Sequence, residues 1–121
     1  MELPLQLTFH HVARSDAITE KVRQRAQGLE RFFDTIHSCR VVIEAPNHHH
    51  EKGNQYRVRI EVSVPGQRLV VTSGADEEHA QTDVYVAIRD AFDAMRRRLE
   101  DYAAVLRGNV KAHAGSGGAR A

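Results

Sequence analysis

The strongest constraint on the fold is an apolar stripe in the C-terminal half of the sequence. Between Val84 and Leu106, apolar residues recur every three or four positions, which places them on one face of an α-helix. The stripe comprises Val84, Ile88, Ala91, Met95, Leu99, Tyr102 and Leu106. The same segment carries Arg89 and the run Arg96–Arg98. We predict a long helix over 83–102, with its stripe continuing to Leu106, that closes a core and presents cations beside it.

The N-terminal part predicts one strand and one helix. Apolar residues alternate from Leu3 to Phe9, as in a strand with one buried face. Ser15 is a suitable N-cap, and the spacing that follows predicts a helix from about Asp16 to Phe33. Its apolar stripe contains Ile18, Val22, Ala26, Leu29 and Phe33.

Three more strands are predicted in the middle of the chain. Residues 38–45 are predicted to form a strand, and Tyr56–Val64 alternates strictly between apolar and polar side chains. Pro65-Gly66 indicates a tight turn into a strand over 67–73. Between the first two of these strands, Pro46–Asn54 is rich in turn-forming residues, and we predict a nine-residue loop.

The predicted order is therefore β-α-β-β-β-α. The long first crossover makes strands one and two parallel, and the short later connections make the remaining neighbours antiparallel. Because the sheet has one apolar face, both helices must cover it. We predict a two-layer α+β sandwich with a four-stranded mixed sheet over residues 1–106, followed by a flexible, basic, glycine-rich tail over 107–121.

Composition limits the class of protein. The single cysteine, Cys39, permits no intrachain disulfide and fits a reducing, cytoplasmic environment. No 18-residue apolar run is present, so we expect no membrane partner. The net charge is only +1, from 17 basic and 16 acidic residues, so a basic surface requires that the charges segregate.

Catalytic and metal sites are not indicated. Cys39 falls in a predicted strand and is interpreted as a small core residue, and no phosphate loop or nucleophile motif is present. His48–His50 could bind zinc, nickel or copper, but adjacent loop residues rarely surround one ion. A solvated polar loop is the favoured interpretation, and we predict no enzyme activity, cofactor or metal.

The basic helix flanks are the remaining candidate site. The proposed RNA-binding residues are Lys21, Arg25 and Arg31 on the first helix and Arg89, Arg96, Arg97 and Arg98 on the second. Sparse aromatics favour contacts to the backbone and shape of structured RNA. The alternative is a solvated face with helical ion pairs such as Arg96–Glu100 and Arg97–Asp101.

Several short motifs together resemble one known family. They are Leu7-Thr8, Ser15–Ile18, Leu29–Arg31, Val70–Gly74, Asp83–Ile88 and Met95–Leu99. In this order, over about residues 5–102, they resemble the ribosome hibernation promoting factor family, also called the ribosome-associated inhibitor or sigma-54 modulation protein family. The most specific motif is Asp-x-Tyr-x-Ala-Ile, which opens the last helix.

The resemblance implies the same β-α-β-β-β-α fold and a function in translation. Such factors bind the tRNA and mRNA channel of the small ribosomal subunit under stress or in stationary phase, and block translation. In the family, basic residues along both helices contact ribosomal RNA, and Arg25, Arg31 and Arg97 keep that charge here. The chain resembles a short form, without the domain that dimerises ribosomes directly, so ribosome pairing would call for a partner factor.

Three positions depart from the family pattern. Gly28, Ala94 and Asp101 stand where basic residues are usual, and His10 replaces a basic residue after the first strand. Fewer phosphate contacts weaken RNA binding. The departures favour an alternative, a protein-interaction module that keeps the fold without binding ribosomes.

Overall fold

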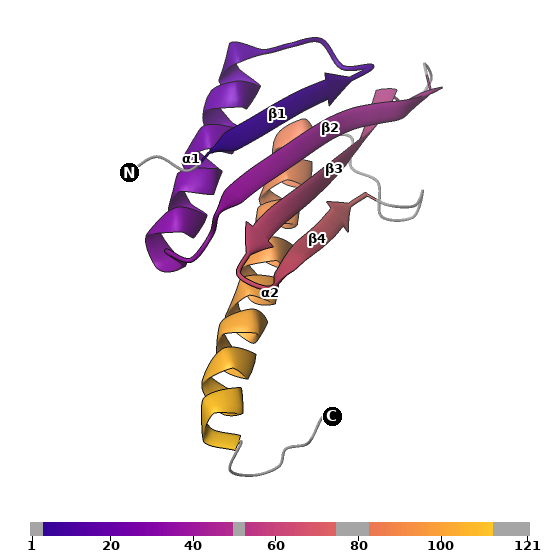
Figure 1. The fold of residues 1–121 in the computed structure, drawn as a ribbon. Helices are drawn as coiled ribbons and strands as arrows, with labels where there is room; N and C mark the ends of the chain where they lie inside the picture. Colours follow the sequence, from indigo (N-terminus) through magenta and orange to yellow (C-terminus); the bar gives the residue numbers. More distant parts are fainter. Residues whose placement is uncertain (1–3, 50–52, 75–82, 113–121) are drawn as a thin grey trace.

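The two helices cover one face of a four-stranded sheet (Figure 1). The computed structural model describes residues 4–49, 53–74 and 83–112. Its elements are β1 (Leu5–His10), α1 (Asp16–Phe32), β2 (Ser38–His49), β3 (Gly53–Val64), β4 (Gln67–Ser73) and α2 (Val84–Ala112). The sheet order is β1-β2-β3-β4, with β1 parallel to β2 and the other neighbours antiparallel. The predicted α+β sandwich is confirmed.

Helix α1 begins and ends as its sequence predicts, to within one residue. The Ser15 hydroxyl accepts a hydrogen bond from the Ile18 amide at 3.2 Å, which caps the first turn. At the other end, the Phe33 amide donates to the Leu29 carbonyl at 2.8 Å. The helix buries Ile18, Val22, Ala26 and Leu29 against the sheet, as predicted. Phe33, the last residue of the predicted stripe, is the C-cap and is only partly buried.

Along strand β3, side chains alternate between the two faces of the sheet. Val58, Ile60 and Val62 are fully buried on the helix side. The alternate residues Arg57, Arg59 and Glu61 therefore lie on the face that no helix covers, hereafter the open face. The layers thus separate an apolar interior from a charged sheet surface.

The predicted loop over 46–54 is wrong in part, because both flanking strands continue into it. β2 runs to His49 and β3 starts at Gly53, with a shift of register between Glu44 and Asn47. This shift is a β-bulge around Pro46, which cannot donate a ladder hydrogen bond. Turn-forming residues therefore mark the bulge as well as the hairpin end. His50 lies outside the described residues, so the imidazole cluster is not tested.

Helix α2 packs on β3 and β4 and then extends past the sheet (Figure 1). Ile88, Met95 and Leu99 are fully buried, and the Tyr102 hydroxyl donates to the Pro65 carbonyl at 2.8 Å. The helix continues to Ala112 and is longer than predicted, because the apolar stripe ends before the helix does. The rest of the expected tail lies outside the described residues. No described helix is long and apolar enough to cross a membrane.

Candidate nucleic-acid interface

One contact fixes which flanks of the two helices face each other. The Arg96 guanidinium of α2 lies 4.8 Å from the centre of the Phe32 ring, at the end of α1. Along α1, Arg25 and Lys21 stand two and three turns before Phe32 and share its flank. Along α2, Arg89 stands two turns before Arg96. These four cations, Lys21, Arg25, Arg89 and Arg96, therefore border the contact between the helices, hereafter the helix junction.

The remaining predicted site residues point elsewhere. Arg31 and Arg97 are exposed and lie off the junction flanks. Arg98 donates a hydrogen bond to the Val70 carbonyl of β4 at 3.1 Å, on the far side of α2 from α1. The run Arg96–Arg98 thus distributes its charge in three directions, toward α1, toward solvent and toward the edge of the sheet.

Some of these cations are paired locally and some are not. Arg89 contacts Asp90 at 3.0 Å, and Arg96 contacts Glu100 at 3.4 Å. Exposed pairs of this kind contribute only about 0–1 kcal/mol, so an incoming phosphate can displace them. Among the described residues, Lys21, Arg25, Arg31 and Arg97 have no ion-pair partner. Of the two predicted helical pairs, Arg96–Glu100 forms and Arg97–Asp101 does not.

Gly28 lies one turn before Phe32, on the junction flank of α1. A Cβ built at Gly28 would have no neighbouring atom within 4 Å, so close packing does not explain this glycine. A β-carbon would therefore fit at this position without displacing the neighbours. No steric requirement therefore explains the glycine. It contributes no charge to the junction, and it destabilises the helix by about 1 kcal/mol relative to alanine.

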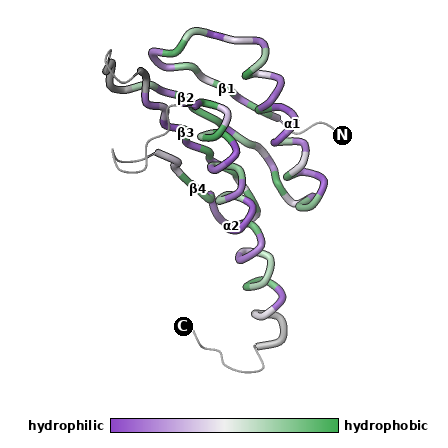
Figure 2. The backbone as a smooth tube through the Cα atoms, turned by 180° about the vertical axis from the view of Figure 1, so that it is seen from behind, coloured by the Kyte–Doolittle hydropathy of each residue, from purple (hydrophilic) through white to green (hydrophobic). Residues whose placement is uncertain are grey.

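Polar and apolar residues alternate along both helices. Figure 2, viewed from behind relative to Figure 1, shows hydrophilic segments recurring along α1 and α2 between hydrophobic ones. Phe32 is a large apolar residue of α1 that stays 62% exposed to solvent. Sequence periodicity assigned Phe33 to the core and gave Phe32 no role. The position of Phe32 off the apolar stripe was the one sign in the sequence that its ring lies on the surface.

Nucleophilic and metal chemistry find no support in the described residues. Cys39 is 1% exposed, and burial raises the pKa of its thiol to about 12, so the thiol stays protonated at neutral pH. Within residues 4–49, 53–74 and 83–112, no group of three histidine, cysteine or acidic side chains could hold a metal ion.

The fold and surface define a small α+β protein with a basic contact between two helices on one side of its sheet. Residues 5–107 match the family model described as sigma 54 modulation protein / S30EA ribosomal protein. The chain belongs to this family, whose members are non-enzymatic, ribosome-associated factors. The expected family is thereby confirmed.

Two solved structures share the fold at low sequence identity. A ribosomal subunit interface protein from Coxiella burnetii has a TM-score of 0.70 and 17% identity, covering 84% of this chain and 99% of the other. The N-terminal domain of Thermus thermophilus Protein Y has a TM-score of 0.64 and 22% identity, with the same coverage. No curated protein matches the sequence significantly.

Proposed function

We propose that this chain is a ribosome hibernation factor that binds small-subunit ribosomal RNA in the tRNA and mRNA channel. Occupation of that channel would block translation sterically, in the cytoplasm and in response to stress. The RNA contacts would come from Lys21, Arg25, Arg31, Arg89, Arg96, Arg97 and Arg98. Family membership supports the ribosome as partner, and the channel and the residues are the proposed detail.

The observation that carries the proposal is the set of cations without local partners. Lys21 and Arg25 line the helix junction, while Arg31 and Arg97 extend from the same two helices. None of the four is neutralised by another described residue. A surface that keeps its guanidinium groups free can exchange solvent for phosphate oxygens at little cost.

Co-sedimentation with purified small ribosomal subunits, at several salt concentrations, tests the proposal. Each phosphate contact releases counterions and contributes about 0.7–0.9 to the slope of log affinity against log salt. With most of the seven cations engaged, affinity should fall roughly a thousandfold over a fourfold rise in salt. Salt-independent pelleting, or no pelleting at low salt, would contradict the mechanism.

Gly28, Ala94 and Asp101 support the rival function, a protein-interaction module. The open space around the Cβ position of Gly28 leaves no packing reason for a glycine there. Restoring charge with Gly28→Lys should strengthen binding to subunits if the junction contacts RNA, because the side chain would join Arg25 on one flank. No gain, together with a specific protein captured from ribosome-depleted lysate, would favour the module.

A further inference from the structure

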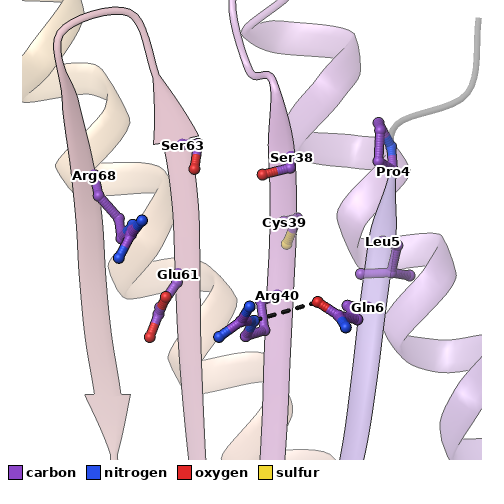
Figure 3. A pocket seen from close by; sticks show the side chains of 9 residues that line it. All are labelled: Pro4, Leu5, Gln6, Ser38, Cys39, Arg40, Glu61, Ser63 and Arg68. Atoms are coloured by element: carbon purple, nitrogen blue, oxygen red, sulfur yellow. Dashed lines mark hydrogen bonds between the residues drawn. The ribbon is translucent and has the colours of Figure 1, made fainter.

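The open face of the sheet contains a hollow of about 400 Å³ (Figure 3). It lies where β2 begins and β3 ends, opposite the layer of helices. Strand register builds it from two adjacent rows. One row crosses the sheet through Ser38, Ser63 and Arg68, and the other through Gln6, Arg40 and Glu61.

The floor of the hollow offers two hydroxyl groups close together. Ser38 and Ser63 are directly opposite each other on antiparallel strands. Directly opposed residues have Cβ atoms about 5 Å apart. Two hydroxyls at that separation can donate to two oxygens of the same tetrahedral anion.

Two arginines flank these hydroxyls. Arg40 on β2 and Arg68 on β4 are two strand spacings and one row apart, about 12 Å between their Cα atoms. Figure 3 shows both guanidinium groups directed toward β3 between them. Arg40 donates a hydrogen bond to the Gln6 amide oxygen, a neutral partner, at 3.3 Å. Arg68 has no hydrogen-bonding partner among the described residues.

Glu61 also lines the hollow, and its charge is already engaged. Its carboxylate lies 3.0 Å from the Arg59 guanidinium on the same strand. One acid therefore faces three nearby cations, Arg40, Arg59 and Arg68, and the hollow keeps an excess of positive charge. Two arginine side chains beside two hydroxyls offer the kinds of donor that bind the oxygens of a phosphate group.

We propose that this hollow binds a phosphate group through Arg40, Arg68, Ser38 and Ser63. The site lies on the opposite side of the sheet from the helix junction and is independent of it. The phosphate could belong to an RNA backbone or to a free nucleotide, since both present the same oxygens. Binding of RNA here would give the protein contacts on two faces.

Backbone amide NMR titration of the full chain tests the site. At constant ionic strength, inorganic phosphate, a nucleoside diphosphate and a short RNA hairpin are added separately. Saturable shifts are expected at residues 38–40, 63 and 68. The double variant Arg40→Gln/Arg68→Gln should weaken the binding at least roughly tenfold, because charge-assisted hydrogen bonds are lost.

Two further variants separate a built site from general electrostatics. Arg14→Gln/Arg23→Gln removes the same charge from exposed positions outside the hollow, and should leave the shifts intact. Ser38→Ala/Ser63→Ala keeps the charge and should still weaken binding severalfold. All four substituted positions on the open face are at least partly exposed, so the amide spectrum should show the fold retained.

The outcomes distinguish the two sources of phosphate. Saturation by inorganic phosphate or the nucleotide supports a small-molecule site, and saturation by the hairpin alone supports a backbone contact. No saturable shift at residues 38–40, 63 and 68 with any probe would overturn the proposal. Equal losses in the Arg14/Arg23 control would do the same. Failure here leaves subunit binding through the helices untouched, because that binding is measured separately, by co-sedimentation with small ribosomal subunits.

Discussion

The guanidinium of Arg96 lies over the ring of Phe32, 4.8 Å from its centre, and joins the middle of α2 to the end of α1. On its other side, the same guanidinium contacts Glu100 at 3.4 Å. An aromatic ring and a carboxylate thus hold one long side chain in place beside the helix junction. This arrangement limits the conformational freedom that Arg96 would lose on binding a phosphate.

A double-mutant cycle should detect this contact. Cation–π contacts at exposed sites contribute about 0.5–1 kcal/mol. The effects of Phe32→Ala and Arg96→Ala on the free energy of unfolding should therefore depart from additivity by about that amount. Urea denaturation of the two single variants and the double variant measures it. As the control, Phe32→Ala combined with Arg97→Ala should be additive, since Arg97 has no partner among the described residues. Additivity in both cycles would show that the ring does not hold Arg96.

Charge reversal should separate the helix surface from the open face of the sheet. Arg25→Glu/Arg97→Glu reverses two unpaired cations, and subunit affinity should fall by at least about tenfold for each lost phosphate contact. Arg57→Glu/Arg59→Glu makes the same charge change on the open face, where Glu44 and Glu61 lie at 4.0 and 3.0 Å. Its effect should be smaller. Circular dichroism first verifies that both variants fold, and co-sedimentation then measures their affinity for subunits. Equal losses of affinity would refute the assignment of RNA binding to the helix surface.

Cys39 should resist alkylation in the folded protein. Burial raises the pKa of its thiol from 9.0 to about 12, so almost no thiolate is present at pH 8. Iodoacetamide should modify the native chain far more slowly than the chain in urea. Comparable rates would show that the thiol is accessible through local opening.

The same pKa shift makes stability depend on pH in a defined direction. Above pH 9.0 the unfolded chain releases the thiol proton and the folded chain keeps it. The contribution of Cys39 to the free energy of unfolding is therefore complete below pH 9.0. It is lost as pH rises toward about 12, at no more than about 1.4 kcal/mol per pH unit. Cys39→Ala should lack this component, and identical pH profiles for the two proteins would contradict the shift.

Sequence periodicity predicted most of the fold because burial follows the geometry of each element. The alternation through Val58, Ile60 and Val62 and the stripe through Met95 and Leu99 correspond to fully buried positions. The hairpin beyond Ala45 was missed because backbone ladder bonds need no apolar pattern. The last turns of α2 were missed for a related reason: an exposed helix can continue without a stripe.

The candidate site was predictable only where one helix determines it. Helical spacing alone places Arg89 and Arg96 on one flank of α2. The hydrogen bond from Arg98 to Val70 and the contact between Arg96 and Phe32 join residues far apart in sequence. Such contacts depend on how the elements pack, so no local pattern could identify them. Whether any of these cations binds RNA stays a prediction.

Strand β1 has a kinetic consequence for the whole sheet. It is six residues long, none of its side chains is fully buried, and it pairs with β2 alone. In a parallel edge strand, alternate amides point away from the partner and exchange with solvent. The β2–β3–β4 meander, by contrast, is built from short-range contacts that form quickly. We expect β1 to detach first in native-state hydrogen exchange while the meander stays protected; equal protection of all four strands would refute this. The sheet would then open between β1 and β2, while β2, β3 and β4 stay paired.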